Sequence, residues 1–121
     1  MPLVVLQYKT DRGLRELAEK LAQELPSIVA SNLTLSKHER HDGQVASDDI
    51  MVWCRESSKA DQNGKDLEII VWAHDFPERK ANLEERKDAI IKGVHGFLAD
   101  YDRNVSGAVW VLLAPTAFGE I

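Results

Sequence analysis

The chain has 121 residues and a formal net charge of −5, with acidic and basic residues interspersed along it. This length fits one ordinary domain spanning residues 1–121, and the charge balance argues against nucleic-acid binding, which requires a basic face. No apolar run approaches the roughly 20 residues that a membrane helix needs, so no membrane partner is expected. Cys54 is the only cysteine. We expect it to be a small buried residue in a reducing, cytoplasmic setting.

The first part of the chain predicts a strand followed by an amphipathic helix. Residues 3–8 are apolar and β-branched, as in a strand that is covered on both faces. Thr10 and Asp11 are candidate caps for the helix. Its apolar residues recur at steps of three and four: Leu14, Leu17, Ala18, Leu21, Ala22 and Leu25. Pro26 is expected to end or kink this helix, with room for one more apolar turn beyond it.

The middle of the chain predicts two further strands. The polar residues 31–48 indicate a loop, and residues 50–55 read as the second strand. Asn63 and Gly64 mark a turn, after which residues 67–73 form the clearest strand in the chain. The turn between these two strands favours a hairpin.

A second helix and a last strand complete the predicted elements. Asn82 and Glu85 have the spacing of a capping box at the start of the helix. Gly93 and Gly96 each weaken a helix by about 1 kcal/mol relative to Ala, which suggests that another backbone comes close there. Residues 108–113 predict the final strand.

The resulting order, β-α-β followed by β-α-β, predicts an α/β (α+β) fold. Two right-handed units of this kind form a four-stranded mixed sheet with both helices on one face. Trp53, Trp72 and Trp110 lie on three different strands, and they belong either to the core or to the uncovered face. An apolar uncovered face is too large to leave in water, so we expect a homo-oligomer that forms through the sheet.

Particular residues give the chain a resemblance to a known family. Met1-Pro2 leads directly into the first strand, and Arg12 stands at the expected start of the first helix. The third strand runs through a short loop into a helix rich in Glu, Arg and Lys near Asn82. With its two β-α-β halves, the chain resembles the tautomerase superfamily, which includes 4-oxalocrotonate tautomerase, 5-carboxymethyl-2-hydroxymuconate isomerase and macrophage migration inhibitory factor. The resemblance implies a homotrimer that isomerises a small keto or enol acid without a cofactor.

The resemblance also implies that Pro2 is a general base. Removal of Met1 would leave a secondary amine at the N-terminus, and an α-amino group has a pKa of about 7.7–8.0. An apolar site or nearby cations disfavour the protonated amine, which suits abstraction of a proton next to a carbonyl. With Met1 attached, the nitrogen is an amide and cannot act as a base. In that alternative Pro2 only begins an edge strand, where a missing N–H is harmless.

Three other residues are candidates for substrate binding. Arg12 matches the position of an arginine in the 4-oxalocrotonate tautomerase branch and would hold a carboxylate; the alternative is a solvated charge. That branch also has an arginine early in its second strand, where this chain has residues 49–52 without one. Arg55, further along the strand, could substitute for it, although a surface ion pair is favoured. Trp110 could form an apolar floor beside Pro2, although a core position is favoured.

The remaining polar motifs support weaker hypotheses. His74 and Asp75 could form an acid–base couple, but neighbours on a strand usually point to opposite faces. Residues 38–42 contain two histidines without a third well-spaced metal ligand, so a solvated loop is favoured and no metal is expected. The element order is also that of ferredoxin-like ligand-binding modules. A non-catalytic member of the superfamily is a further alternative.

Overall fold

The computed structural model describes residues 2–10, 12–35, 44–101 and 104–121. Its elements in chain order are β1 (Leu3–Tyr8), α1 (Arg15–Leu33), the short 3-10 helix η2 (Ser47–Asp49), β2 (Met51–Glu56), β3 (Leu67–His74), α2 (Pro77–Ala81), α3 (Leu83–Ala99) and β4 (Gly107–Ala114). The four strands form one mixed sheet in the order β2-β1-β3-β4, which confirms the predicted fold class.

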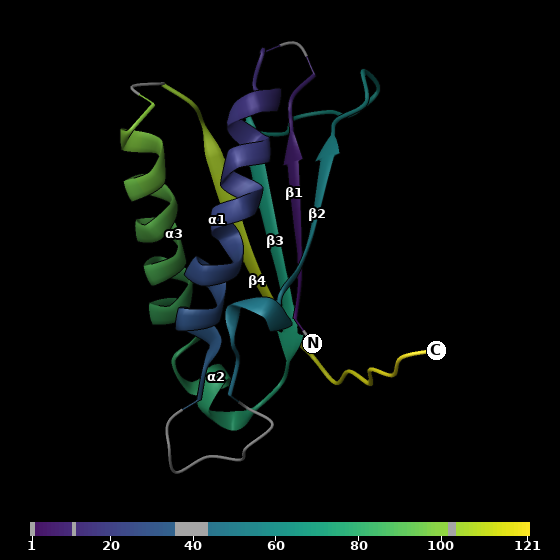
Figure 1. Ribbon diagram of the computed structural model, residues 1–121, viewed down its shortest axis with the longest axis vertical. Helices are drawn as coiled ribbons and strands as arrows, with labels where there is room; N and C mark the ends of the chain where they lie inside the picture. Colours follow the sequence, from purple (N-terminus) through teal and green to yellow (C-terminus); the bar gives the residue numbers. More distant parts are fainter. Residues whose placement is uncertain (1, 11, 36–43, 102–103) are drawn as a thin grey trace.

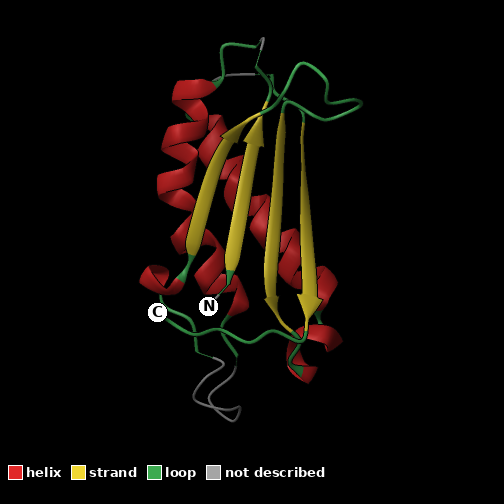
Figure 2. Cartoon of the chain, turned by 90° about the vertical axis from the view of Figure 1, so that its right-hand side faces the viewer, coloured by secondary structure: helices red, strands yellow, loops and turns green. Residues whose placement is uncertain are grey.

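The sheet and the helices form two layers. β1 runs parallel to β2 and antiparallel to β3, and β3 runs parallel to β4. Both long helices, α1 and α3, cover the same face of the sheet, as Figure 1 shows. Figure 2 shows the sheet from the other side, with the helices behind it. The two β-α-β units and the shared side of their helices are therefore confirmed. Within the described residues, neither long helix is long and apolar enough to cross a membrane.

The predicted hairpin between the second and third strands is wrong. β1 lies between β2 and β3, so these two strands are not neighbours in the sheet. The first crossover through α1 places β2 parallel to β1 on one side, which leaves the other side of β1 for β3. The β2–β3 connection therefore spans the end of β1, and Asn63 takes a left-handed φ of 63° within it. Asparagine tolerates that conformation better than most residues.

The first helix differs from its predicted bounds at both ends. Its N-cap is Leu14, without a side-chain hydrogen bond. Thr10 is not a cap, because its hydroxyl contacts the Ser57 carbonyl, and Asp11 lies outside the described residues. The helix continues through Pro26 to Leu33, so it includes residues 31–33, which the sequence assigned to the following loop. Proline costs a helix about 3 kcal/mol. The fully buried residues beyond it offset that cost, at about 1.5–3 kcal/mol for each large side chain.

The second long helix begins as predicted but without the capping box. Asn82 is the N-cap and makes no capping bond; its Oδ1 instead accepts a 2.6 Å hydrogen bond from Arg86 Nε. A Cβ at Gly93 would lie 2.8 Å from Cγ2 of Ile28, so a side chain of α1, rather than a backbone, makes the close approach. At Gly96 nothing lies within 4 Å of such a Cβ, and the prediction of a close approach is wrong there.

The core lies between the sheet and the helices, and it does not include the tryptophans or the cysteine. Trp53, Trp72 and Trp110 are 44%, 43% and 57% exposed, so the uncovered-face alternative is confirmed. Cys54 is exposed, which contradicts its predicted burial. It pairs with the buried Leu6 in register, but it belongs to the edge strand β2, where the helix layer ends.

Candidate functional site

Pro2 begins a central strand of the sheet. Its carbonyl accepts a hydrogen bond of 3.1 Å from the Met51 N–H. Because β1 lies between β2 and β3, the alternative in which Pro2 starts an edge strand is wrong. Pro2 is buried, and the alternation of side chains along β1 places it on the helix-covered side with Val4 and Leu6. The Pro2 ring therefore lies on the helix-covered side of the sheet, the side on which the apolar core lies.

Two arginines that sequence reasoning did not single out for this role lie at the same end of the sheet. Arg79, in α2, is only 2% exposed, and its Nε donates a 2.9 Å hydrogen bond to the Leu33 carbonyl. Its Nη1 donates to the His74 carbonyl at 3.1 Å. Arg86 Nη1 donates to the Thr34 carbonyl at 3.2 Å. Together they hold the C-terminal end of α1, where backbone carbonyls have no helical partner.

The two guanidinium groups also act on each other electrostatically. Burial lowers the pKa of Arg79, and the nearby positive charge of Arg86 lowers it further. Arginine titrates so far above neutral pH that Arg79 stays charged despite this lowered pKa. Arg86 Nη2 lies 3.9 Å from Glu78 Oε2. No periodic or motif signal in the sequence distinguishes the buried Arg79 and the partly buried Arg86 from exposed arginines.

The His74–Asp75 couple, which the sequence disfavours, is not formed, because each side chain has another partner. The Thr116 N–H donates to His74 Nδ1 at 3.3 Å, so that nitrogen is the acceptor, and a neutral ring carries its hydrogen on Nε2. Asp75 Oδ2 instead lies 4.0 Å from Lys80 Nζ. His74 thus anchors the start of the C-terminal segment, which leaves the sheet at this end (Figure 1). The predicted loop at residues 38–42 lies outside the described residues.

Arg12 lies at the opposite end of β1, in the turn before α1. Its Nη1 is 3.6 Å from Oδ1 of Asp66, which is 4% exposed. The Ser106 N–H donates a 3.0 Å hydrogen bond to Asp66 Oδ2. This bond lowers the pKa of Asp66, the Arg12 charge lowers it further, and burial opposes both. Arg12 therefore has a structural partner, although half of its side chain is exposed.

This geometry predicts a pH-dependent contribution of Asp66 to stability. A carboxyl whose pKa is lower in the folded than in the unfolded protein stabilises the folded state at any pH above its unfolded pKa of about 3.9. This contribution is lost as the pH falls through the pKa of the folded state. We expect Asp66→Asn to lower the free energy of unfolding by about 1–2 kcal/mol at pH 7. Urea denaturation at pH 7 and pH 2.5 tests this. The difference in free energy of unfolding between wild type and Asp66→Asn should be smaller at pH 2.5 than at pH 7. An equal difference at both pH values contradicts a stabilising role of the ionised Asp66.

Arg55 and Trp110 lie on the uncovered face. Arg55 pairs in register with Gln7, near the end of β1, and its Cζ is 5.2 Å from the Trp53 ring centroid. Trp110 Nε1 donates to Glu68 Oε2 at 3.3 Å. The 6-residue strand β1 lies between Pro2 and Arg12, and Arg55 pairs with Gln7 near the end of β1 away from Pro2. Such a strand is about 20 Å long. One protomer therefore does not bring the candidate base together with its predicted arginine anchors.

The uncovered face carries two apolar rows that cross all four strands. Register pairs place Trp53, Val5, Ile70 and Trp110 in one row and Met51, Leu3, Trp72 and Leu112 in the next. Beyond the first row comes a more polar one, with Arg55, Gln7, Glu68 and Ala108. Figure 2 shows that neither helices nor loops of the same chain cover the middle of this face.

Known proteins resemble this chain in structure. No family model matches the sequence, and no curated protein matches it either. The crystal structure of native Ps01740 is similar to this chain with a TM-score of 0.54 and 15% identity, covering 93% of this chain and 94% of that one. A 5-carboxymethyl-2-hydroxymuconate isomerase from Deinococcus radiodurans R1 is similar with a TM-score of 0.51 and 13% identity, covering 96% and 83%. At these identities the likeness shows the fold alone, which is the part of the predicted resemblance that is confirmed.

Proposed function

We propose that this chain is the protomer of a homo-oligomeric, cofactor-independent isomerase in which the N-terminal amine of Pro2 is the general base. The substrate is a small keto or enol acid, and the reaction moves a proton between carbon and oxygen or along a double bond. The observation that carries the proposal is the position of Pro2, buried at the start of a central strand in a fold shared with a known isomerase. The exposed free thiol of Cys54 fits a cytoplasmic setting.

The surroundings of Pro2 support a basic amine. Once Met1 is removed, the nitrogen is a secondary amine beside apolar groups, which disfavour its protonated form. Arg79 and Arg86 bring positive charge to the same end of the sheet and act in the same direction. Both conditions favour a neutral amine at neutral pH, the form that accepts a proton from carbon.

A complete site requires a second copy of the chain. Arg12 and Arg55 are the proposed carboxylate anchors, and both lie toward the end of β1 away from Pro2. The two apolar rows of the uncovered face give copies a surface on which to associate. In such an assembly, Arg12 or Arg55 of one copy approaches Pro2 of a neighbour, and Trp110 lines the apolar side. A trimer is the assembly that the family resemblance implies.

The test is the conversion of phenylenolpyruvate by protein whose intact mass shows loss of Met1. We expect Pro2→Ala to lower kcat/KM about 10- to 100-fold, because a general base contributes about 100-fold or more and the primary amine of Ala replaces part of it. Pro115→Ala, in the exposed C-terminal segment, is the matched control and should keep the wild-type rate. Equal rates for wild type and Pro2→Ala, or universal retention of Met1, end the enzyme proposal.

A further inference from the structure

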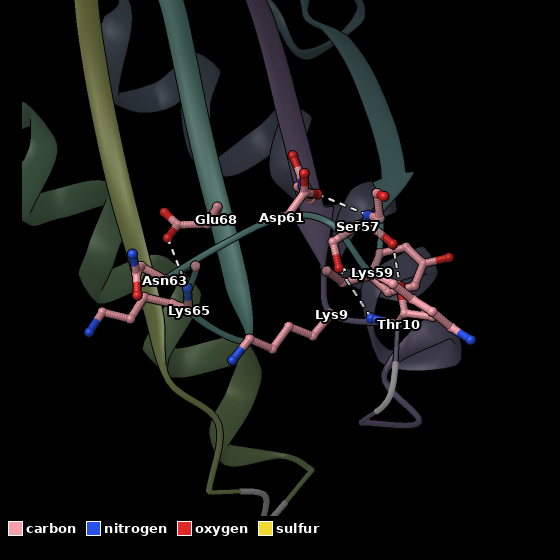
Figure 3. A pocket seen from close by; sticks show the side chains of 12 residues that line it. Lys9, Thr10, Ser57, Lys59, Asp61, Asn63, Lys65 and Glu68 are labelled. Carbon is pink, nitrogen blue, oxygen red and sulfur yellow. Dashed lines mark hydrogen bonds between the residues drawn. The ribbon is translucent and has the colours of Figure 1, made fainter.

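A cavity lies at the end of the sheet away from Pro2. Its volume is about 420 Å³, and it is lined by the end of β1 and by the β2–β3 connection. The connection folds back over the uncovered face, where the Gln7 amide donates a 3.0 Å hydrogen bond to Asp61 Oδ2. Figure 3 shows the lining side chains, which come from segments far apart in the sequence. The volume is in the range of small-molecule sites.

Backbone hydrogen bonds fix the walls of this cavity. The Ser57 N–H donates to the Tyr8 carbonyl at 2.8 Å, and the Thr10 N–H donates to Ser57 Oγ at 3.2 Å. The Lys9 N–H donates to the Asp66 carbonyl at 3.0 Å. Each of these bonds joins the end of β1 or the residues just after it to one end of the β2–β3 connection. The cavity is thus held open by the fold and does not depend on side-chain contacts alone.

The two carboxylates that line the cavity are already occupied by neutral donors. Asp61 Oδ2 accepts from the Ser58 N–H at 2.8 Å as well as from the Gln7 amide. Glu68 Oε1 accepts from the Lys65 N–H at 3.0 Å, and its Oε2 accepts from the Trp110 indole. These hydrogen bonds orient both carboxylates but leave their two negative charges in place.

Three lysines line the same cavity, against the two carboxylates. Lys9, Lys59 and Lys65 come from three segments, and Figure 3 shows Lys9 and Lys65 on the Glu68 side and Lys59 on the Thr10 side. Among the described residues, no ion pair within 4.0 Å joins any of the three ammonium groups to a carboxylate. The lining therefore carries more unneutralised positive charge than negative charge.

A hydroxyl group adds a hydrogen-bond donor to this charge. Ser58 Oγ accepts from the Ala60 N–H at 3.1 Å, so its own hydrogen is left to donate. Ammonium and hydroxyl donors around a polar cavity suit an oxyanion, because charged hydrogen bonds are about twice as strong as neutral ones. We propose that this cavity, at the rim of the uncovered face, is a binding site for a small oxyanion ligand, a phosphate or a carboxylate, separate from Pro2.

The Trp110 indole provides a reporter for this site. It bonds to Glu68, which lines the cavity, and the chain has 3 tryptophans, so few indole signals need assignment. The experiment follows the ¹H–¹⁵N spectrum of the full chain at low, fixed ionic strength during titration with inorganic phosphate and, separately, with malonate. The Trp110 signal is assigned with Trp110→Phe. We expect saturable shifts at Trp110, Ser58 and Lys65, with half-saturation below about 10 mM for at least one anion.

A charge-matched pair of variants separates a built site from general attraction. Lys9→Gln/Lys65→Gln should weaken binding at least about tenfold, because it removes two of the three ammonium groups at the cavity. Lys20→Gln/Lys92→Gln removes the same charge from exposed helix positions and should weaken it less than about twofold. Pro2→Ala should bind as the wild type does, whatever its activity. Shifts that do not saturate with either anion, or equal weakening in both double variants, overturn the proposal. Saturation with only one anion supports it and identifies the ligand class.

Discussion

Replacement of Trp72 by lysine is expected to dissociate the proposed oligomer into folded protomers. Trp72 lies on the central strand β3, in the apolar row with Leu3 and Leu112, and it is 43% exposed in the isolated chain. A lysine at this position can reach water in the protomer, so the fold should survive. In an interface formed by the uncovered face, the ammonium group is buried without a partner, which costs several kcal/mol. We therefore expect the dissociation constant to rise at least about 1,000-fold.

Sedimentation velocity over a wide range of protein concentration measures this effect, and far-UV circular dichroism checks that the variant is folded. Gln23→Lys is the matched control, because it adds the same charge to an exposed position of α1 on the helix-covered side. It should keep the mass of the wild type. A wild-type protein that is monomeric at every concentration, or a Trp72→Lys variant with unchanged mass, shows that the uncovered face is not the interface. If residues from two copies of the chain form the active site, Trp72→Lys should also lose activity.

The local pattern of the sequence predicts most of the elements of this fold. In β3, residues Leu67, Ile69, Val71 and Ala73 are buried and alternate with more exposed ones, as the strand signal requires. The register of the sheet then determines which tryptophans face outward. Once the side of the sheet covered by the helices is known, alternation along a strand assigns each side chain to one face of the sheet.

Pairing between strands is not a local property, and the predicted hairpin failed for that reason. The turn residues Asn63 and Gly64 are compatible with a hairpin, and Asn63 does adopt the left-handed conformation. Whether β2 pairs with β3 depends on where the α1 crossover leaves β1, which involves residues far away in the sequence. Pro26 does not end the helix for a related reason, since its cost is offset by burial of Val29, Ala30 and Leu33 in the next two turns.

The candidate site was only partly predictable. The separation of Pro2 from Arg12 could have been anticipated, because the two residues flank a strand of 6 residues. The burial of Arg79 could not, since it depends on the end of α1 lying over the short helix α2. The lysines of the β2–β3 connection read as ordinary loop charges until the connection is seen to fold back over β1. Sequence reasoning found residues with suitable chemistry, whereas their distances required the fold.

Arg79→Ala is expected to lower the free energy of unfolding by about 3–5 kcal/mol. The side chain is 2% exposed, and it joins three elements through the carbonyls of Leu33 and His74 and through its stacking on Phe76, 5.0 Å from the ring centroid. A charged hydrogen bond contributes about 1.5–3 kcal/mol, and truncation leaves two carbonyls without these donors as well as a cavity. The free energy of unfolding of a domain is only about 5–15 kcal/mol, so the loss expected for Arg79→Ala is a large fraction of it.

Urea denaturation with a two-state fit measures the change, and two variants separate its causes. Arg79→Lys keeps the charge but lacks the planar fork that reaches both carbonyls, so it should recover only part of the loss. Arg15→Ala, which removes an exposed arginine paired with Glu19, should change stability little. If Arg79→Lys is as stable as wild type, the positive charge matters more than the hydrogen-bond geometry. If Arg79→Ala resembles Arg15→Ala, the buried guanidinium does not hold α1, and its role at the Pro2 end of the sheet must be sought in substrate binding.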